Sequence, residues 1–137
     1  MFEHVVVAVD GSPQSSKTIP VAVDLAKRYG STVTIVHCRE FERYEASDVD
    51  LGPPIPAQKL VDETVAMFRE AGVDATGEVR KVRPGETPEK IIDAAKKSQA
   101  DLIVMGTRGM TELKSLLLGG VATKVVHHAT CPVLLVR

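Results

Sequence analysis

Short apolar runs alternate with longer amphipathic segments along the chain. Residues 5–9 form a continuous run of Val and Ala, which is typical of a strand buried on both faces. Similar apolar runs occur at residues 32–38, 101–105 and 132–136. Residues 75–82 alternate apolar and polar positions, as expected for a less buried edge strand. The pattern therefore predicts five strands.

Four helices are predicted between these strands. Ser12 is a favourable N-cap for the first, with Pro13 at the first helical position, and Gly30 provides its C-terminal stop. Pro20 predicts a kink or a later start of that helix, because proline disrupts a helix interior. Thr87, which precedes a proline, is expected to cap the third helix. The other two helices are expected over residues 56–71 and 120–129.

The alternation of strands and helices predicts one α/β domain spanning residues 1–137. Strands separated by helices must pair in parallel through right-handed crossovers. Residues 39–55 fit neither pattern, because they are rich in acidic residues and end in a Gly-Pro-Pro turn. A loop of this length is expected to be either a mobile insertion or a lid over a ligand.

Charge and composition exclude several classes of protein. The formal net charge of −1 gives no bulk attraction to nucleic acid or anionic membranes. No apolar run approaches the roughly 20 residues needed to span a bilayer, and no basic segment precedes the first strand. These features predict a cytoplasmic protein. Cys38 and Cys131 form no paired motif, so both are expected to be buried, reduced thiols rather than a disulfide or redox pair.

The familiar nucleotide and metal motifs are absent from the sequence. There is no G-x-x-x-x-G-K-[ST], no G-x-G-x-x-G after the first strand and no H-E-x-x-H. A P-loop enzyme, a dinucleotide-binding protein of the usual kind and a zinc protease are therefore not expected.

The most informative stretch surrounds the end of the fourth predicted strand. Gly106 follows that strand directly, Gly109 lies three residues on, and Gly119 and Gly120 precede the last helix. Glycine permits positive φ and close approach of a ligand to the backbone. Amides from the loop and from the helix N-terminus would then face one anion. Ordinary turn glycines between a strand and a helix are the alternative interpretation.

The spacing G-x2-G-x9-G, followed by a small residue, resembles the ATP-binding signature of the universal stress protein family. Four blocks resemble that family's pattern in order: residues 6–12, Gly85 with its following helix, residues 101–106 and residues 131–136. The resemblance covers the chain except residues 39–55. It implies an α/β fold of the Rossmann-like, adenine nucleotide alpha hydrolase-like type, with an open five-stranded parallel sheet of order 3-2-1-4-5 and helices on both faces. The crevice between the first and fourth strands is then the expected ligand site.

The resemblance also implies which residues bind ATP, ADP or AMP. Asp10, with Ala8 beside it, resembles the position that contacts adenine and ribose, and Cys38 falls where an apolar residue lines the adenine pocket. The residues expected around the ribose and phosphates are Met105, Gly106, Thr107, Arg108, Gly109, Met110 and Thr111 in the loop, and Gly119, Gly120 and Val121 at the helix. Asp10 is also the candidate contact for a nucleotide-bound Mg²⁺.

One position departs from the family's pattern. ATP binders of the family usually carry Ser or Thr after the third glycine, where this chain has Gly120. A lost hydrogen bond to a charged phosphate is worth about 1.5–3 kcal/mol. Weakened ATP binding, or a preference for ADP or AMP, is therefore expected. Thr123 could supply the hydroxyl from one helical turn further on.

Other polar residues have competing interpretations. Arg108 and Lys114 could neutralise phosphate charge or simply be solvated surface residues. His127, His128 and Cys131 could suggest a metal site, but histidines in the last turn of a helix are favoured by its dipole in any case. His37 is expected to be structural.

The sequence favours a nucleotide-dependent regulator of the stress response. A slow ATP hydrolase or phosphoryl-transfer enzyme and a nucleotide-free dimeric scaffold are the alternatives. Weak ATPase activity is the most that is expected, since no general base and no acidic pair for Mg²⁺ beyond Asp10 is evident. The resemblance further suggests a homodimer joined through residues 132–136, an apolar strand at the sheet edge.

Overall fold

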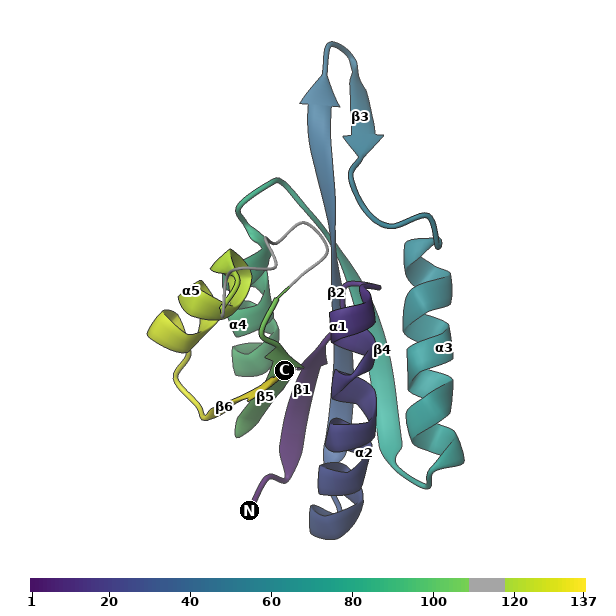
Figure 1. Ribbon diagram of the computed structural model, residues 1–137, viewed down its shortest axis with the longest axis vertical. Coiled ribbons are helices and arrows are strands. Elements are labelled where there is room, and N and C mark those ends of the chain that lie inside the picture. Colours follow the sequence, from purple (N-terminus) through teal and green to yellow (C-terminus); the bar gives the residue numbers. More distant parts are fainter. Residues whose placement is uncertain (109–117) are drawn as a thin grey trace.

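The computed structural model describes residues 1–108 and 118–137, and its ribbon is shown in Figure 1. The strands are β1 (His4–Ala8), β2 (Thr32–Tyr44), β3 (Ser47–Asp50), β4 (Asp74–Val82), β5 (Leu102–Gly106) and β6 (Val133–Val136). The helices are α1 (Pro13–Ser16), α2 (Thr18–Tyr29), α3 (Ala57–Glu70), α4 (Thr87–Lys97) and α5 (Gly120–His128). Among the helices of these ranges, none has the length and apolar character needed to cross a bilayer.

The parallel strands lie in the order β4-β2-β1-β5-β6. This is the predicted order 3-2-1-4-5 once β3 is set aside. β1 is central, since Val5 pairs with Val33 of β2 on one side and with Leu102 of β5 on the other. The direction of strand order reverses between β1 and β5, so a crevice is expected at their carboxyl ends.

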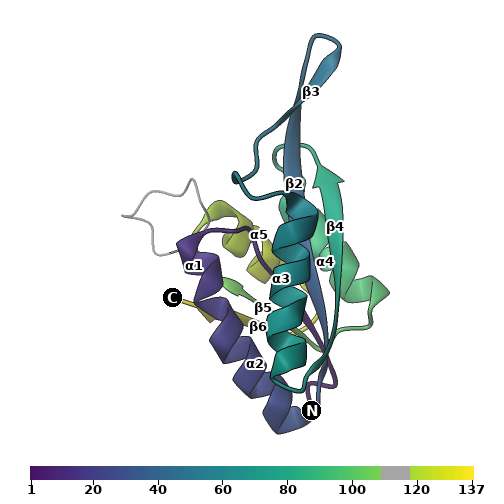
Figure 2. The ribbon, with the colours of Figure 1, turned by 90° about the vertical axis from the view of Figure 1, so that its right-hand side faces the viewer.

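The segment predicted as a long loop is partly a β-hairpin. β2 continues to Tyr44, and β3 returns antiparallel to it, with Phe41 opposite Asp50. The hairpin projects beyond the helices in both views of the ribbon (Figure 2). The sheet is therefore mixed and six-stranded, and the prediction of a purely parallel five-stranded sheet was wrong here. This segment contains many charged residues and few residues of high β-propensity, so its sequence gave only a weak indication of a strand.

Two apolar cores cover the two faces of the sheet. On one face, Val5 and Val7 of β1 pack with the buried sides of α2 and α3, including the fully buried Phe68. On the other face, Val6 packs with α4 and α5, including Ile91. This alternation along β1 places neighbouring side chains on opposite faces, and it explains why the strand is apolar throughout.

Two helix starts differ from the sequence prediction. The first predicted helix is split at Lys17, and α2 begins at Thr18. Pro20 thus lies in the first turn of α2, where its missing N–H costs nothing. The N-cap of α4 is Glu86 rather than Thr87. The hydroxyl of Thr87 instead donates to a carboxylate oxygen of Glu40 at 3.1 Å.

Candidate functional site

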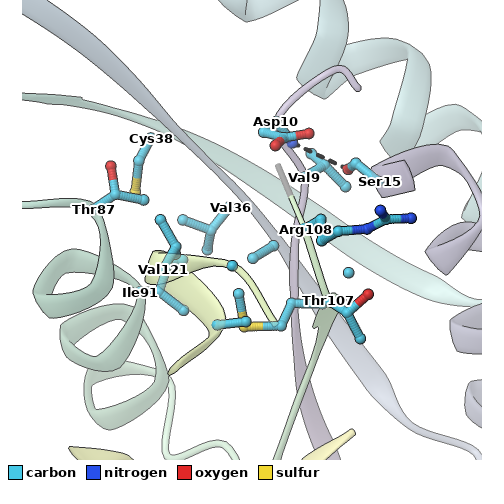
Figure 3. Close-up of a pocket in the computed structure, with 15 residues that line it drawn as sticks. Val9, Asp10, Ser15, Val36, Cys38, Thr87, Ile91, Thr107, Arg108 and Val121 are labelled. Carbon is cyan, nitrogen blue, oxygen red and sulfur yellow. Dashed lines mark hydrogen bonds between the residues drawn. The ribbon is translucent and has the colours of Figure 1, made fainter. Parts of the chain in front are cut away.

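A pocket lies beyond the carboxyl ends of β1 and β5 and beside the middle of β2, with α4 and the start of α5 on its other side (Figure 3). The space within it is about 530 Å³, with open solvent at the mouth included. It is lined by Ala8, Val9, Asp10, Ser15, Val36, Cys38, Thr87, Ile91, Met105, Gly106, Thr107, Arg108, Gly119, Val121 and Ala122. The pocket therefore occupies the crevice that the topology predicts.

A hydrogen-bonded turn holds Asp10 at the end of β1. Its carboxylate accepts from the N–H of Ser12 at 2.9 Å, and its own N–H donates to the hydroxyl of Ser15 at 3.1 Å. Ser12 caps α1 as predicted, since its hydroxyl accepts from the N–H of Ser15 at 3.0 Å. Gly11 follows with φ of +81°, a value that disfavours other residues. The turn fixes Asp10 and Ser15 at one side of the pocket.

A second set of hydrogen bonds joins the end of β5 to the start of α5. The N–H of Gly119 donates to the carbonyl of Thr107 at 2.6 Å, and the N–H of Thr107 donates to the carbonyl of Val136 at 3.0 Å. The amide of Gly119 is thus engaged within the protein. Val121 and Ala122, in the first turn of α5, line the pocket. The N-terminus of α5 therefore brings its partial positive charge to the pocket.

Positive φ was the reason expected for glycine at 106 and 119, and the structure does not show it. Gly119 has φ of −72°, and Gly106 is the last residue of β5 and is not among the positive-φ glycines of the described ranges. A Cβ at Gly106 would lie 3.5 Å from the carbonyl oxygens of Gln14 and Arg108, an ordinary contact. Neither backbone conformation nor packing within the chain requires glycine at 106.

The thiol in the pocket carries no charge at neutral pH. Burial raises the pKa of Cys38 to about 12, since the thiolate would lose its hydration. Cys38 and Cys131 are both free thiols, as predicted, but each is only partly buried, so the prediction that both are buried was wrong. The side of the pocket formed by Cys38, Val36 and Ile91 is consequently neutral.

Nine of the residues predicted to bind a nucleotide line this single pocket. They are Ala8, Asp10, Cys38, Met105, Gly106, Thr107, Arg108, Gly119 and Val121. Gly120 does not line it and is exposed at the start of α5. Gly109, Met110, Thr111 and Lys114 lie outside the described residues.

Several lining residues were not predicted from the sequence. They are Val9, Ser15, Val36, Thr87, Ile91 and Ala122. Periodicity could have found one of them, since Val36 precedes Cys38 by two positions on the same strand. Ser15 and Thr87 carried no such signal.

Three other sequence candidates do not contribute to the pocket as suggested. The hydroxyl of Thr123 donates to the carbonyl of Gly119 at 2.8 Å within its own helix, so it does not replace the missing hydroxyl at Gly120. His127 and His128 lie side by side with ring centroids 6.4 Å apart. Over residues 1–108 and 118–137, no group of His, Cys, Asp and Glu is arranged to hold a metal ion.

His37 lies on β2 and does not line the pocket. It is 1% exposed, and its Nδ1 lies 2.9 Å from the carbonyl oxygen of Val9. Because a carbonyl can only accept, Nδ1 carries the proton. Nε2 is buried without a hydrogen-bond partner in the part of the chain that the structure describes.

Comparison with known proteins decides the family. The model of the universal stress protein family matches residues 1–137. The chain belongs to the universal stress protein family. A universal stress protein of Thermus aquaticus, encoded in the QAH/OAS sulfhydrylase 3′ region, is 38% identical over 142 residues, covering 100% of both chains.

Solved universal stress proteins share this fold. A universal stress protein from Archaeoglobus fulgidus superposes with a TM-score of 0.75 at 28% identity, covering 100% of both chains. The structure of the universal stress protein from Archaeoglobus fulgidus in complex with dAMP gives a TM-score of 0.74 at 27% identity, over 99% of this chain and 98% of that one. Nucleotide binding is therefore known among the relatives of this universal stress protein.

Proposed function

We propose that this universal stress protein binds an adenine nucleotide in the pocket between β1 and β5, and acts in the cytoplasm as a nucleotide-dependent regulator of the stress response. One observation carries the proposal: residues of β1, β2, β5 and α5 that the sequence predicted to bind a nucleotide converge on one pocket. The dAMP complex of a relative supports an adenine nucleotide as the ligand class.

The polarity of the pocket orients the proposed ligand. The apolar part, with Val36, Ile91 and Met105, suits the faces of a base. Gly106 and the first turn of α5 suit phosphate, because backbone can approach closely there and the helix end carries partial positive charge. Asp10, as a carboxylate, would repel phosphate and suits ribose hydroxyls.

Asp10 also gives the proposed place for Mg²⁺. It is a carboxylate lining the pocket, and Mg²⁺ is commonly held by one or two carboxylates together with nucleotide phosphates. The ion would increase the affinity for ATP by offsetting repulsion between Asp10 and the phosphates. It would matter little for AMP, which has fewer phosphate oxygens.

Isothermal titration calorimetry with AMP, ADP and ATP, each with and without Mg²⁺, tests the proposal. We expect binding of all three, with AMP or ADP preferred. Ala8→Leu, which adds volume within the pocket, should reduce the affinity at least tenfold. Ala46→Leu at the exposed hairpin tip is the matched control and should change nothing. Circular dichroism should show that both variants are folded; silence of all three nucleotides on folded wild-type protein would overturn the proposal.

Two alternatives remain separable by experiment. Steady-state release of phosphate from ATP above the buffer rate, abolished by Asp10→Ala, would favour a slow hydrolase. Purification without nucleotide, together with the absence of a calorimetric signal for any nucleotide, would favour a dimeric scaffold.

We propose that the regulator is itself a homodimer joined through β6, whose residues are all partly exposed at the sheet edge. A monomer by light scattering at micromolar concentration would contradict this.

A further inference from the structure

The pocket ends at a side-chain hydroxyl whose orientation is set by a carboxylate. Thr87, the first residue of α4, lines the pocket. Its Oγ1 lies 3.1 Å from Oε1 of Glu40 on β2, in a partly buried hydrogen bond. Figure 3 shows Thr87 and Cys38 at one end of the pocket, and Asp10, Ser15 and Arg108 at the other.

The chemistry of this pair fixes what Thr87 can offer a ligand. An ionised carboxylate only accepts hydrogen bonds, so the hydroxyl proton of Thr87 must point to Glu40. The lone pairs of Oγ1 remain, and they can only accept. A ligand group that meets Thr87 therefore gains a hydrogen bond if it is a donor, and meets lone-pair repulsion if it is a carbonyl.

Among the described residues, the groups near Thr87 include a neutral thiol and two cations that each lie beside a carboxylate. The thiol of Cys38 stays neutral and is a weak donor. Arg80, which lies beside Cys38 in the sheet, donates to Glu78 at 3.2 Å. Lys90, on α4, lies 3.9 Å from Asp93. Thr87 thus places a hydrogen-bond acceptor in a pocket that the apolar Val36 and Ile91 also line.

We infer that Thr87 is a specificity-determining residue that selects a purine with an exocyclic amino group over one with a keto group, and that Glu40 is the residue that positions its hydroxyl. The inference rests on the proposed function, because it assigns the base to the apolar part of the pocket. It goes further by naming the side chain that reads the base edge.

Three ligands isolate this contact: AMP, IMP and purine riboside 5′-monophosphate, which lacks the amino group but keeps N1 as an acceptor. By calorimetry, wild-type protein should bind AMP about tenfold more tightly than the riboside monophosphate, in line with one hydrogen bond, and IMP still more weakly. Thr87→Val keeps the shape but removes the acceptor, so AMP and the riboside monophosphate should then bind alike. Thr123→Val is the matched control, since that hydroxyl bonds within α5, and it should keep the wild-type ratio.

Glu40→Gln tests the positioning role. The amide of Gln can donate to Thr87, which lets the hydroxyl proton turn toward the ligand. The ratio of AMP to IMP affinity should therefore fall, chiefly through tighter IMP binding, whereas a merely structural defect would weaken both nucleotides alike. If AMP binds but Thr87→Val leaves its advantage over the riboside monophosphate intact, the inference is overturned and nucleotide binding stands. If none of the three ligands binds folded wild-type protein, nucleotide binding fails and the inference fails with it.

Discussion

The guanidinium of Arg39 holds the carboxylate of Asp50 in a two-point contact, with Nε–Oδ1 at 2.8 Å and Nη2–Oδ2 at 3.0 Å. Its other hydrogen bonds reach the carbonyl of Ile55 at 3.1 Å and that of Pro53 at 2.7 Å. These bonds tie the chain after β3 to β2. Pro53 in turn lies against Gly11: a Cβ there would come within 2.9 Å of the Pro53 ring. Arg39 therefore links the hairpin to the turn that carries Asp10.

Removing the carboxylate should destabilise the fold measurably. The side chain of Arg39 is only 6% exposed, while that of Asp50 is 45% exposed. Asp50→Ala leaves a buried guanidinium without its charged partner, so we expect a loss of about 1–3 kcal/mol in the free energy of unfolding, toward the lower end because Asp50 is half in solvent. Urea denaturation of both proteins measures this.

Asp24→Ala provides the comparison for Asp50→Ala. Asp24 pairs with Arg28 at 2.8 Å, but both side chains are largely exposed, so its removal should change stability little. Equal effects of the two substitutions would show that the burial of Arg39 does not matter energetically.

Acidification should weaken the fold through His37. Burial is the main cause that lowers the pKa of His37 below its ordinary value of 6.5. The unfolded chain takes up a proton near that ordinary value while the folded protein does not. Stability is therefore complete above about pH 6.5 and falls as the pH drops from there toward the lowered pKa of the folded state.

Urea denaturation at pH 7.5 and pH 5.5 tests this expectation with His37→Asn, whose amide can still donate to the carbonyl of Val9. The variant should lose less stability between the two pH values than the wild type does. His4→Asn, at an exposed position, should retain the wild-type pH dependence. The contribution of Asp50 to stability does not change between these two pH values. Hydrogen bonding by Arg39 lowers the pKa of Asp50 below 3.8, so its stabilisation is lost only at lower pH. An unchanged pH dependence in His37→Asn would assign the acid sensitivity to another group.

Restoring a hydroxyl at the start of α5 should favour ATP. Gly120→Ser places a donor at the helix N-terminus, where a terminal phosphate would lie under the proposed function. A hydrogen bond to a charged group of about 1.5–3 kcal/mol corresponds to a gain in ATP affinity of roughly tenfold to a hundredfold, with AMP nearly unchanged. Calorimetry with both nucleotides measures the ratio. A gain of equal size for AMP would mean that the serine stabilises the helix rather than contacting the outer phosphates.

The amino-acid sequence by itself determined the parallel strands, and its resemblance to the universal stress protein family implied their order and the edge of the sheet at which a ligand would bind. Hydrophobic periodicity reports burial directly, and a helix between two strands forces their parallel pairing. The apolar runs locate the ends of β1 and β5, and the strand order implied by the resemblance then assigned Ala8, Asp10 and Gly106 to one crevice.

Only the tertiary structure decided the hairpin, the pairing of Arg39 with Asp50 and the contact between Thr87 and Glu40. These side chains carry ordinary surface-type charges or hydroxyls, so no periodic pattern marks them as buried or paired. Thr87 in particular looked like a helix cap, and the carboxylate that receives its proton lies on another element, 47 positions away in the chain. Burial of such groups depends on which distant segments fold over them, and that is a property of the packed sheet rather than of local sequence.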